Sequence, residues 1–252
     1  MRAFYQTQWL DIEFSSFAEL SSTIIAGHEF YDAFYQAVFK RYANYASLPA
    51  DWLHNKNEIT DWLAATIPDG SRVLSVGCGL GYMEQRLWQH HAKRIDLHVY
   101  DYASESSRWL KQVIPAENIH NTEGCQTGIG KYDLIYLSAV DYALADNELV
   151  MLLSQLKDLL RPNGQIMMIS ASFLDESPSQ KLIHVAKEIV KCLLLQLRLR
   201  SSEIHQFWGW MRTRDEYRSI MHQAGLVFVT DNLFMTRHQK TYFIKGIGVA
   251  KE

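Results

Sequence analysis

Three alternating glycines have the residue types and spacing of a ligand-binding loop. The apolar run RVLSVG (72–77) leads into Gly77, Gly79 and Gly81, and a helical pattern follows. Glycine lets the backbone turn tightly and approach a ligand closely, and the next helix N-terminus offers unpaired N–H groups. Asp101 ends the next strand-like run, where a carboxylate can accept both hydrogen bonds of a ribose 2′,3′-diol. The pattern therefore predicts a site for an adenosine compound.

The glycine spacing distinguishes between classes of cofactor. The dinucleotide fingerprint is GxGxxG, whereas this chain has GxGxG with Tyr82 at the position of the third glycine. The phosphate-binding pattern GxxxxGK[ST] does not occur in the sequence. We therefore expect a small adenosine cofactor without a pyrophosphate, and a nicotinamide oxidoreductase is disfavoured.

The elements that position this loop alternate between strand and helix from about residue 70. Such alternation requires right-handed crossovers and gives a parallel sheet covered on both faces. The last two predicted strands are joined by a connection too short for a helical crossover, so they should be antiparallel. Predicted strands are 72–77, 95–101, 118–123, 132–140, 165–172, 226–233 and 240–251; predicted helices are 81–91, 104–113, 148–160 and 213–224.

Two regions lie outside this alternation. Residues 1–66 hold almost half of the aromatic rings and are predicted to form a helical, amphipathic cap or lid. Residues 67–252 then form the cofactor-binding domain, with a mostly helical insertion at 175–212 that should overhang the site together with the cap. A basic amphipathic helix over 180–200 could contact an anionic membrane surface, although packing on the domain or on a dimer partner is the simpler interpretation.

Four segments of the chain resemble the class I S-adenosylmethionine-dependent methyltransferases. They are VLSVGCGLG (73–81), Asp101, KYDLIYLS (131–138) and LLRPNGQIMMIS (159–170), within a resemblance that runs from about 68 to 249. The resemblance implies an α/β, seven-stranded Rossmann-like sheet of order 3-2-1-4-5-7-6 with its last strand antiparallel. It also implies S-adenosylmethionine as cofactor and S-adenosylhomocysteine as product.

The resemblance also implies which residues hold the cofactor. The family often has an acid at the position of Ser75 and an aspartate at that of Cys125, so Gln126 or a backbone group could hold the adenine instead. Tyr102 could flank the adenine or cover the sheet edge. The implied cofactor-binding residues are Ser75, Gly77, Cys78, Gly79, Gly81, Tyr82, Asp101, Tyr102, Cys125, Gln126 and Ser138.

In the family, the segment after the fourth strand faces the transferred methyl group, and here it carries two candidate catalytic residues. Asp141 could take the acceptor proton or orient the acceptor, and Tyr142 could donate to it or stack on it. Alternatively, Asp141 caps the next helix and Tyr142 packs. His205 in the insertion is a second candidate base, or a surface histidine. Asp141, Asp146 and Asn147 fit helix capping better than metal binding, so no metal is predicted.

Composition limits the acceptor and the partners. The net charge of −3 gives no basic field for nucleic acid. DNA adenine-N6 methyltransferases resemble one another in a Pro-Pro motif after the fourth strand, and cytosine-C5 enzymes use a Pro-Cys nucleophile; neither dipeptide occurs in this chain. The family resemblance then favours a small-molecule acceptor, first a hydroxyl of a sugar, glycoside or natural product. N-methylation, or a catalytically silent partner with the methyltransferase fold, remain alternatives. Three scattered cysteines, no long apolar run and no secretory leader pattern predict a cytoplasmic protein. Either a monomer or a homodimer is expected.

Overall fold

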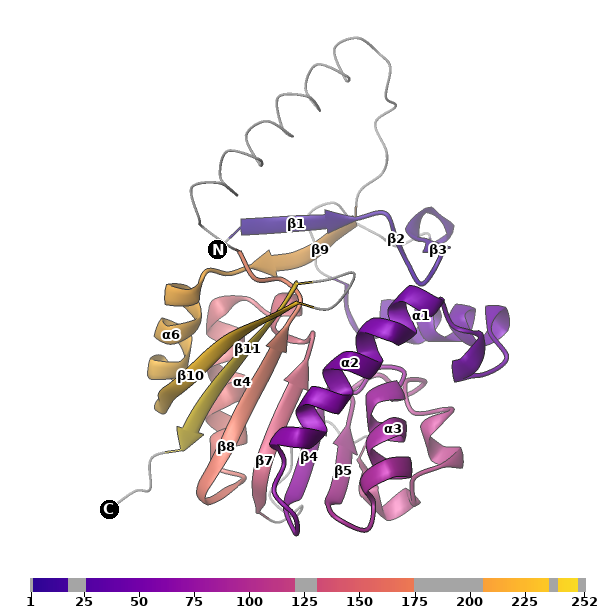
Figure 1. The fold of residues 1–252 in the computed structure, drawn as a ribbon. Coiled ribbons are helices and arrows are strands. Elements are labelled where there is room, and N and C mark those ends of the chain that lie inside the picture. The colour runs from indigo at the N-terminus through magenta and orange to yellow at the C-terminus, as the bar shows by residue number, and fades with distance from the viewer. Residues whose placement is uncertain (1, 18–25, 121–130, 175–205, 236–239, 249–252) are drawn as a thin grey trace, which may run out of the picture.

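A seven-stranded sheet forms the centre of the molecule in a computed structural model that describes residues 2–17, 26–120, 131–174, 206–235 and 240–248 (Figure 1). The strand order is β10-β11-β8-β7-β4-β5-β6. Neighbouring strands from β6 to β8 are parallel, and β11 is antiparallel to both of its neighbours. This order confirms the predicted sheet. The strands are β4 (Arg72–Val76), β5 (Asp96–Tyr100), β6 (Ile119–His120), β7 (Tyr132–Ser138), β8 (Leu160–Ser170), β10 (Leu226–Met235) and β11 (Lys240–Gly248).

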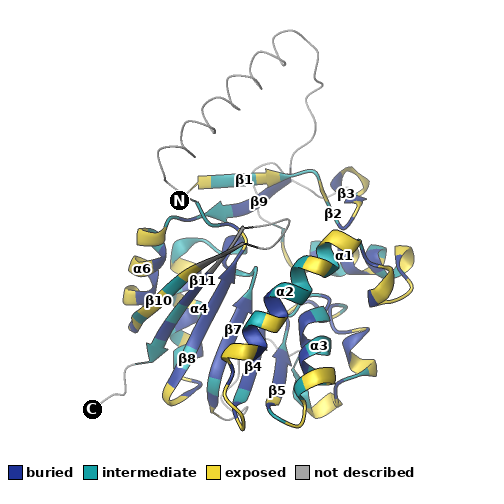
Figure 2. Ribbon diagram, in the orientation of Figure 1, coloured by how far each residue is buried: buried dark blue, intermediate teal, exposed yellow. Residues whose placement is uncertain are grey.

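Helices cover both faces of the sheet, as the apolar character of the central strands requires. The helices α2 (Ala50–Thr66) and α3 (Tyr82–His91) pack on one face, and α4 (Asp146–Lys157) and α6 (Arg214–Gln223) pack on the other. Figure 2 shows the buried central strands and the exposed outer sides of α2 and α3. Helix α6 begins with a capping box, in which the Thr213 hydroxyl accepts from the backbone N–H of Glu216 and the Glu216 carboxylate accepts from that of Thr213.

The predicted helix over 104–113 is wrong, because turns and a short 3₁₀ helix, η3 (Leu110–Gln112), occupy this segment. Local side chains compete with helical hydrogen bonding there. The Asp101 carboxylate accepts from the backbone N–H of Ala103 at 2.9 Å, and the Ser106 hydroxyl donates to the Ala103 carbonyl at 2.7 Å. These bonds fix turns directly after β5.

The N-terminal region is helical only in part. Helices α1 (His28–Arg41) and α2 agree with the helical character predicted for residues 1–66, and a 3₁₀ turn, η2 (Tyr45–Ser47), lies between them. Strand β1 (Arg2–Gln6), however, pairs antiparallel with β9 (Gln206–Met211). The helical prediction is therefore wrong for residues 2–6 and 206–211. The sequence of β1, RAFYQ, does not alternate between buried and exposed residues, so no strand pattern marks it.

A short hairpin connects β1 to the rest of the cap. Strands β2 (Gln8–Trp9) and β3 (Ile12–Glu13) are joined by Leu10 and Asp11, both at positive φ as a tight two-residue hairpin turn requires. A 3₁₀ turn, η1 (Phe14–Ser16), follows. Figure 1 shows the β1–β9 ribbon above the carboxyl ends of the parallel strands. The cap and the ribbon therefore cover the edge of the sheet where the predicted site lies.

Helix 180–200, proposed above as a membrane or partner contact, lies outside the described residues. Among the helices that the structure describes, none has the length and apolar character needed to span a membrane.

Candidate active site

The loop between β4 and α3 has the left-handed backbone that its glycines predict. The φ angles of Gly77, Gly79 and Gly81 are 71°, 58° and 75°. A Cβ on Gly77 would lie 2.4 Å from Cγ2 of Val140, and one on Gly81 would lie 2.8 Å from a methyl of Leu110. Side chains at these two positions would therefore suffer both backbone strain and steric overlap.

Asp101 fixes this loop through hydrogen bonds. Its Oδ2 accepts from the Gly79 N–H at 2.7 Å, and its Oδ1 accepts from the Ala103 N–H at 2.9 Å. The side chain is buried, and burial raises the pKa of Asp101 to about 6. A carboxylate offers about four acceptor positions. Asp101 can thus shape the loop and still accept hydrogen bonds from a ligand.

A buried carboxylate that the sequence analysis missed lies beside Ser75. The Ser75 hydroxyl donates to Oε1 of Glu84 at 2.7 Å, and the Tyr136 hydroxyl donates to the same oxygen at 2.6 Å. Burial raises the pKa of Glu84, against the lowering effect of these two donors. The Glu84 carboxyl, on α3, therefore lies beside the position at which the family often carries an acid. An acid in a first helical turn is common, so its position alone gave no signal.

A lysine of the cap also reaches the carboxyl edge of the sheet. The Nζ of Lys56, on α2, donates to the Ser138 hydroxyl at the end of β7 over 3.3 Å, and it lies 3.8 Å from the Met83 sulfur. Desolvation by burial lowers the pKa of Lys56, and the charge of Glu84 raises it by less. No motif marks this lysine in the sequence, because its position depends on how α2 packs on the sheet.

Asp141 belongs to a buried network behind the loop that follows β7. It starts the 3₁₀ turn η5 (Asp141–Ala143), and its Oδ2 accepts from the hydroxyls of Ser170, at 2.7 Å, and Tyr217. Burial raises the pKa of Asp141, against the lowering effects of Tyr217, Ser170 and Arg212. The contacts of its Oδ2 thus hold η5 against β8 and α6.

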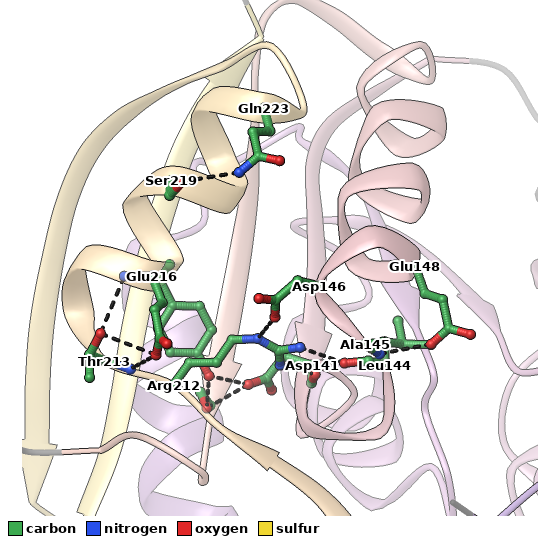
Figure 3. A network of polar contacts seen from close by, with 12 residues as sticks. Asp141, Leu144, Ala145, Asp146, Glu148, Arg212, Thr213, Glu216, Ser219 and Gln223 are labelled. Carbon is green, nitrogen blue, oxygen red and sulfur yellow. Dashed lines mark hydrogen bonds and ion pairs between the residues drawn. The ribbon is translucent and has the colours of Figure 1, made fainter. Parts of the chain in front are cut away.

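Arg212 completes this network from the end of β9. Its fully buried guanidinium donates to the carbonyl oxygen of Asp141 at 2.6 Å, to that of Leu144 at 2.5 Å and to the Asp146 carboxylate at 2.8 Å. Figure 3 shows Arg212 reaching Asp146 and Leu144, next to the capping box of α6. One side chain thereby links β9, η5 and α4. No pattern in the sequence indicated this role of Arg212.

Tyr142 lies among the rings of the cap. It stacks on Trp208 with ring centroids 6.1 Å apart. Burial raises the pKa of Tyr142 to about 12. Gly209 makes this packing possible, because a Cβ there would lie 2.1 Å from the Tyr142 carbonyl oxygen. The ribbon strand β9 therefore rests directly on the segment that follows β7.

The other predicted cofactor residues are distributed around the loop. Tyr82 donates to the Asn57 side chain at 2.6 Å, and Tyr102 is half exposed with its ring edge against Tyr31. Cys78 lies within the loop, and burial raises the pKa of its thiol. Cys125, Gln126 and His205 lie outside the described residues, so their predicted roles stay predictions.

Two hydroxyls of the cap touch the loop itself. The buried Tyr45 hydroxyl donates to the Leu80 carbonyl at 2.6 Å. The Tyr35 hydroxyl lies 3.1 Å from where a Cβ on Gly79 would be.

Over the parts of the chain that the structure describes, no group of three or more His, Cys, Asp or Glu residues could hold a metal ion.

Solved structures share this fold. A putative O-methyltransferase from Nostoc punctiforme is similar with a TM-score of 0.58 and 16% identity, over 90% of this chain and 63% of that one. Human N-acetylserotonin methyltransferase has a TM-score of 0.56 and 21% identity, over 92% of this chain and 60% of that one. Magnesium protoporphyrin IX methyltransferase from Synechocystis has a TM-score of 0.50 and 18% identity, over 78% of this chain and 83% of that one. This chain thus spans less than two thirds of the first two proteins. At these identities the likeness establishes the fold.

Comparison of sequences gives the family. No curated protein matches the chain significantly. A family model described as a methyltransferase domain matches residues 45–231, which include the glycine loop, Asp101, Ser138 and Asp141. Because that match covers well over half of the sequence, the chain belongs to the methyltransferase-domain family.

Proposed function

We propose that this chain transfers the methyl group of S-adenosylmethionine to a hydroxyl of a small molecule. The observation that carries the proposal is the bond from the Gly79 N–H to Asp101, which joins the glycine loop to a carboxylate at the end of β5. A ribose diol has two O–H donors, and this carboxylate keeps acceptor positions for them. Similar folds occur in methyltransferases crystallised with S-adenosylmethionine or S-adenosylhomocysteine.

The chain's own residues would bind the cofactor and exclude water. When bound, the cofactor supplies a methyl group on a positively charged sulfur. Glu84 brings negative charge to the region beside Ser75, on the α3 side of the loop. Aromatic rings from α1, β9 and η5 cover the carboxyl edge, which desolvates the reactants and favours an in-line displacement.

Asp141 and Tyr142 act as positioning residues in this proposal. The Asp141 Oδ2 is bonded to Ser170 and Tyr217, and the Tyr142 ring is stacked on Trp208. Both side chains hold η5 in place at the end of β7. A hydroxyl acceptor then loses its proton to a base as the methyl group is transferred.

The acceptor proposed first is a hydroxyl of a sugar, a glycoside or another natural product. Support comes from the aromatic cap and from the absence of a basic field in the sequence. Two of the proteins with similar folds are named for N-acetylserotonin and magnesium protoporphyrin IX, which are small molecules.

Calorimetric titration with S-adenosylmethionine and S-adenosylhomocysteine tests the cofactor. We expect micromolar affinity for both, and a loss of at least tenfold in Asp101→Ala. The exposed Asp69→Ala, whose carboxylate pairs with Arg94 far from the loop, is the matched control and should bind normally. Absence of binding in the wild type, or unchanged affinity in Asp101→Ala, would contradict the proposal.

An acceptor panel then tests the reaction. S-adenosylhomocysteine release is followed with glycosides, phenols and matched amines, and the methylated product is identified by mass spectrometry. A hydroxyl-methylated product supports the proposal, and an N-methylated one replaces it with N-methylation. Tight cofactor binding without turnover on the whole panel would favour a silent partner protein.

A further inference from the structure

Lys56 is a half-buried cation at the carboxyl edge of the sheet, and its contacts are too weak to balance its charge. Within the described part of the chain, its polar contacts are one hydroxyl, on Ser138, and one thioether, on Met83. The Trp52 ring lies 5.8 Å from the ammonium, at the limit of a cation–π contact. Buried charges in proteins are normally paired with an opposite charge, because desolvation is otherwise costly.

The nearby carboxylate of Glu84 does not fill this role. Its charge acts on Lys56, but both of its donors come from other residues, since the hydroxyls of Ser75 and Tyr136 bind the same oxygen. The shortest contact of the lysine is to Ser138 on β7. The amine is therefore directed toward the end of that strand, with donor capacity left over for an anion.

The position of Lys56 relative to Asp101 fits one part of the proposed cofactor. Asp101 follows β5 and Ser138 ends β7, and both strands pair with β4, which carries the glycine loop. Adjacent strands lie about 4.8 Å apart, so the two ends are separated by roughly 10 Å across the loop. A ligand with its ribose at Asp101 that crosses the glycines brings its far end to Lys56. In S-adenosylmethionine, the far end is an amino acid whose carboxylate is the molecule's only negative group.

We propose that Lys56, from the cap helix α2, binds the α-carboxylate of the cofactor, with the Ser138 hydroxyl beside it. This role rests on the proposed function. It assigns part of the cofactor site to α2, in addition to the glycine loop and Asp101. The ligand's carboxylate would supply the opposite charge that the contacts of the amine lack.

A double-mutant cycle, in which one change removes the lysine amine and the other removes the ligand's carboxylate, tests this assignment. S-adenosylmethionine and its decarboxylated analogue, which differ only in the carboxylate, are titrated calorimetrically into the wild type and into Lys56→Met. We expect Lys56→Met to weaken S-adenosylmethionine at least tenfold and the decarboxylated analogue less than twofold. The exposed Lys93→Met, on the turn after α3, is the control and should change neither affinity.

Each other outcome overturns a definite statement. If Lys56→Met weakens both ligands equally, or neither, the lysine does not bind the carboxylate. If the wild type binds neither ligand, the proposed function fails as well, which separates the two failures. Thermal melting checks that Lys56→Met folds, and Lys56→Gln repeats the cycle with a polar side chain. Lys56→Arg should recover part of the affinity for S-adenosylmethionine alone.

Discussion

At the scale of single residues, backbone conformation and steric space both favour glycine at position 77 of the loop. Gly77 has a positive φ of 71°, and its missing Cβ leaves room for Val140. Gly70 has a similar φ of 78°, but nothing lies within 4 Å of where its Cβ would be. The two glycines therefore separate backbone strain from steric overlap.

Gly77→Ala should destabilise the protein by about 2–4 kcal/mol, the sum of left-handed strain and overpacking. Gly70→Ala carries the strain alone and should cost about 1 kcal/mol. Urea unfolding measures both. Adding Val140→Ala to Gly77→Ala removes the overlapping methyl and should recover part of the loss. Equal losses for the two glycine variants would show that Val140 does not restrict position 77.

Cofactor affinity should depend on pH through Asp101. Burial raises the pKa of Asp101 to about 6, and the ionised carboxylate is the form that accepts from a ribose diol. Affinity for S-adenosylhomocysteine should therefore be constant above pH 7 and fall by up to tenfold per pH unit below 6. Calorimetry between pH 5 and pH 8 measures this, and Asp101→Asn should bind weakly with little change over the same range. A flat wild-type profile would contradict the role of the carboxylate.

At the scale of elements, Arg212 determines how β9, η5 and α4 fit together. Its guanidinium donates to the carbonyl oxygens of Asp141 and Leu144, and its removal takes this buried donor away from both. Arg212→Met should therefore lower the free energy of unfolding by about 2–4 kcal/mol. The control is Arg218→Met on α6, where a half-exposed ion pair with Asp215 should contribute less than about 0.5 kcal/mol. Similar losses of unfolding free energy in the two variants would show that the buried hydrogen bonds of Arg212 stabilise the protein no more than an exposed ion pair does.

At the scale of the whole molecule, the cap and the sheet share one core. Phe14, buried in the cap, stacks on Trp208 of β9 with centroids 4.7 Å apart, and Trp208 stacks on Tyr142 at the end of β7. Tyr45 reaches the glycine loop from the same cap. The hydrophobic cluster that contains these rings therefore spans both regions.

Phe14→Ala should accordingly destabilise the entire protein, by about 3–5 kcal/mol, and not the cap alone. Tryptophan fluorescence, which includes Trp9 and Trp208 of this cluster, and far-UV circular dichroism should report the same midpoint in urea. The exposed Tyr5→Ala serves as the control. A fluorescence transition that precedes the loss of helix would show that the cap unfolds independently.

The glycine loop, Asp101 and the antiparallel last pair of strands could be predicted because each leaves a local pattern or a fixed spacing, and the resemblance to the methyltransferases implied the sheet order. Glu84, Lys56 and Arg212 were missed because their partners are set by packing between distant elements. The helix predicted over 104–113 does not form, because the side chains of Asp101 and Ser106 make hydrogen bonds to the backbone of Ala103 that compete with helical ones. Asp141 was found by position, but the direction of its carboxylate, toward Ser170 and Tyr217, depends on β8 and α6.

The pairing of β1 with β9 has a consequence for biosynthesis. Arg2 pairs with Met211, so about 200 residues must be synthesised before β1 can find its partner. At roughly 5–20 residues per second, the ribosome needs on the order of 10–40 s for that length. During this time Trp9 and Phe14 lack the ring of Trp208 that packs against them in the folded chain. The growing chain thus displays an aromatic segment that chaperones can recognise, and the covering of the site is one of the last steps of folding.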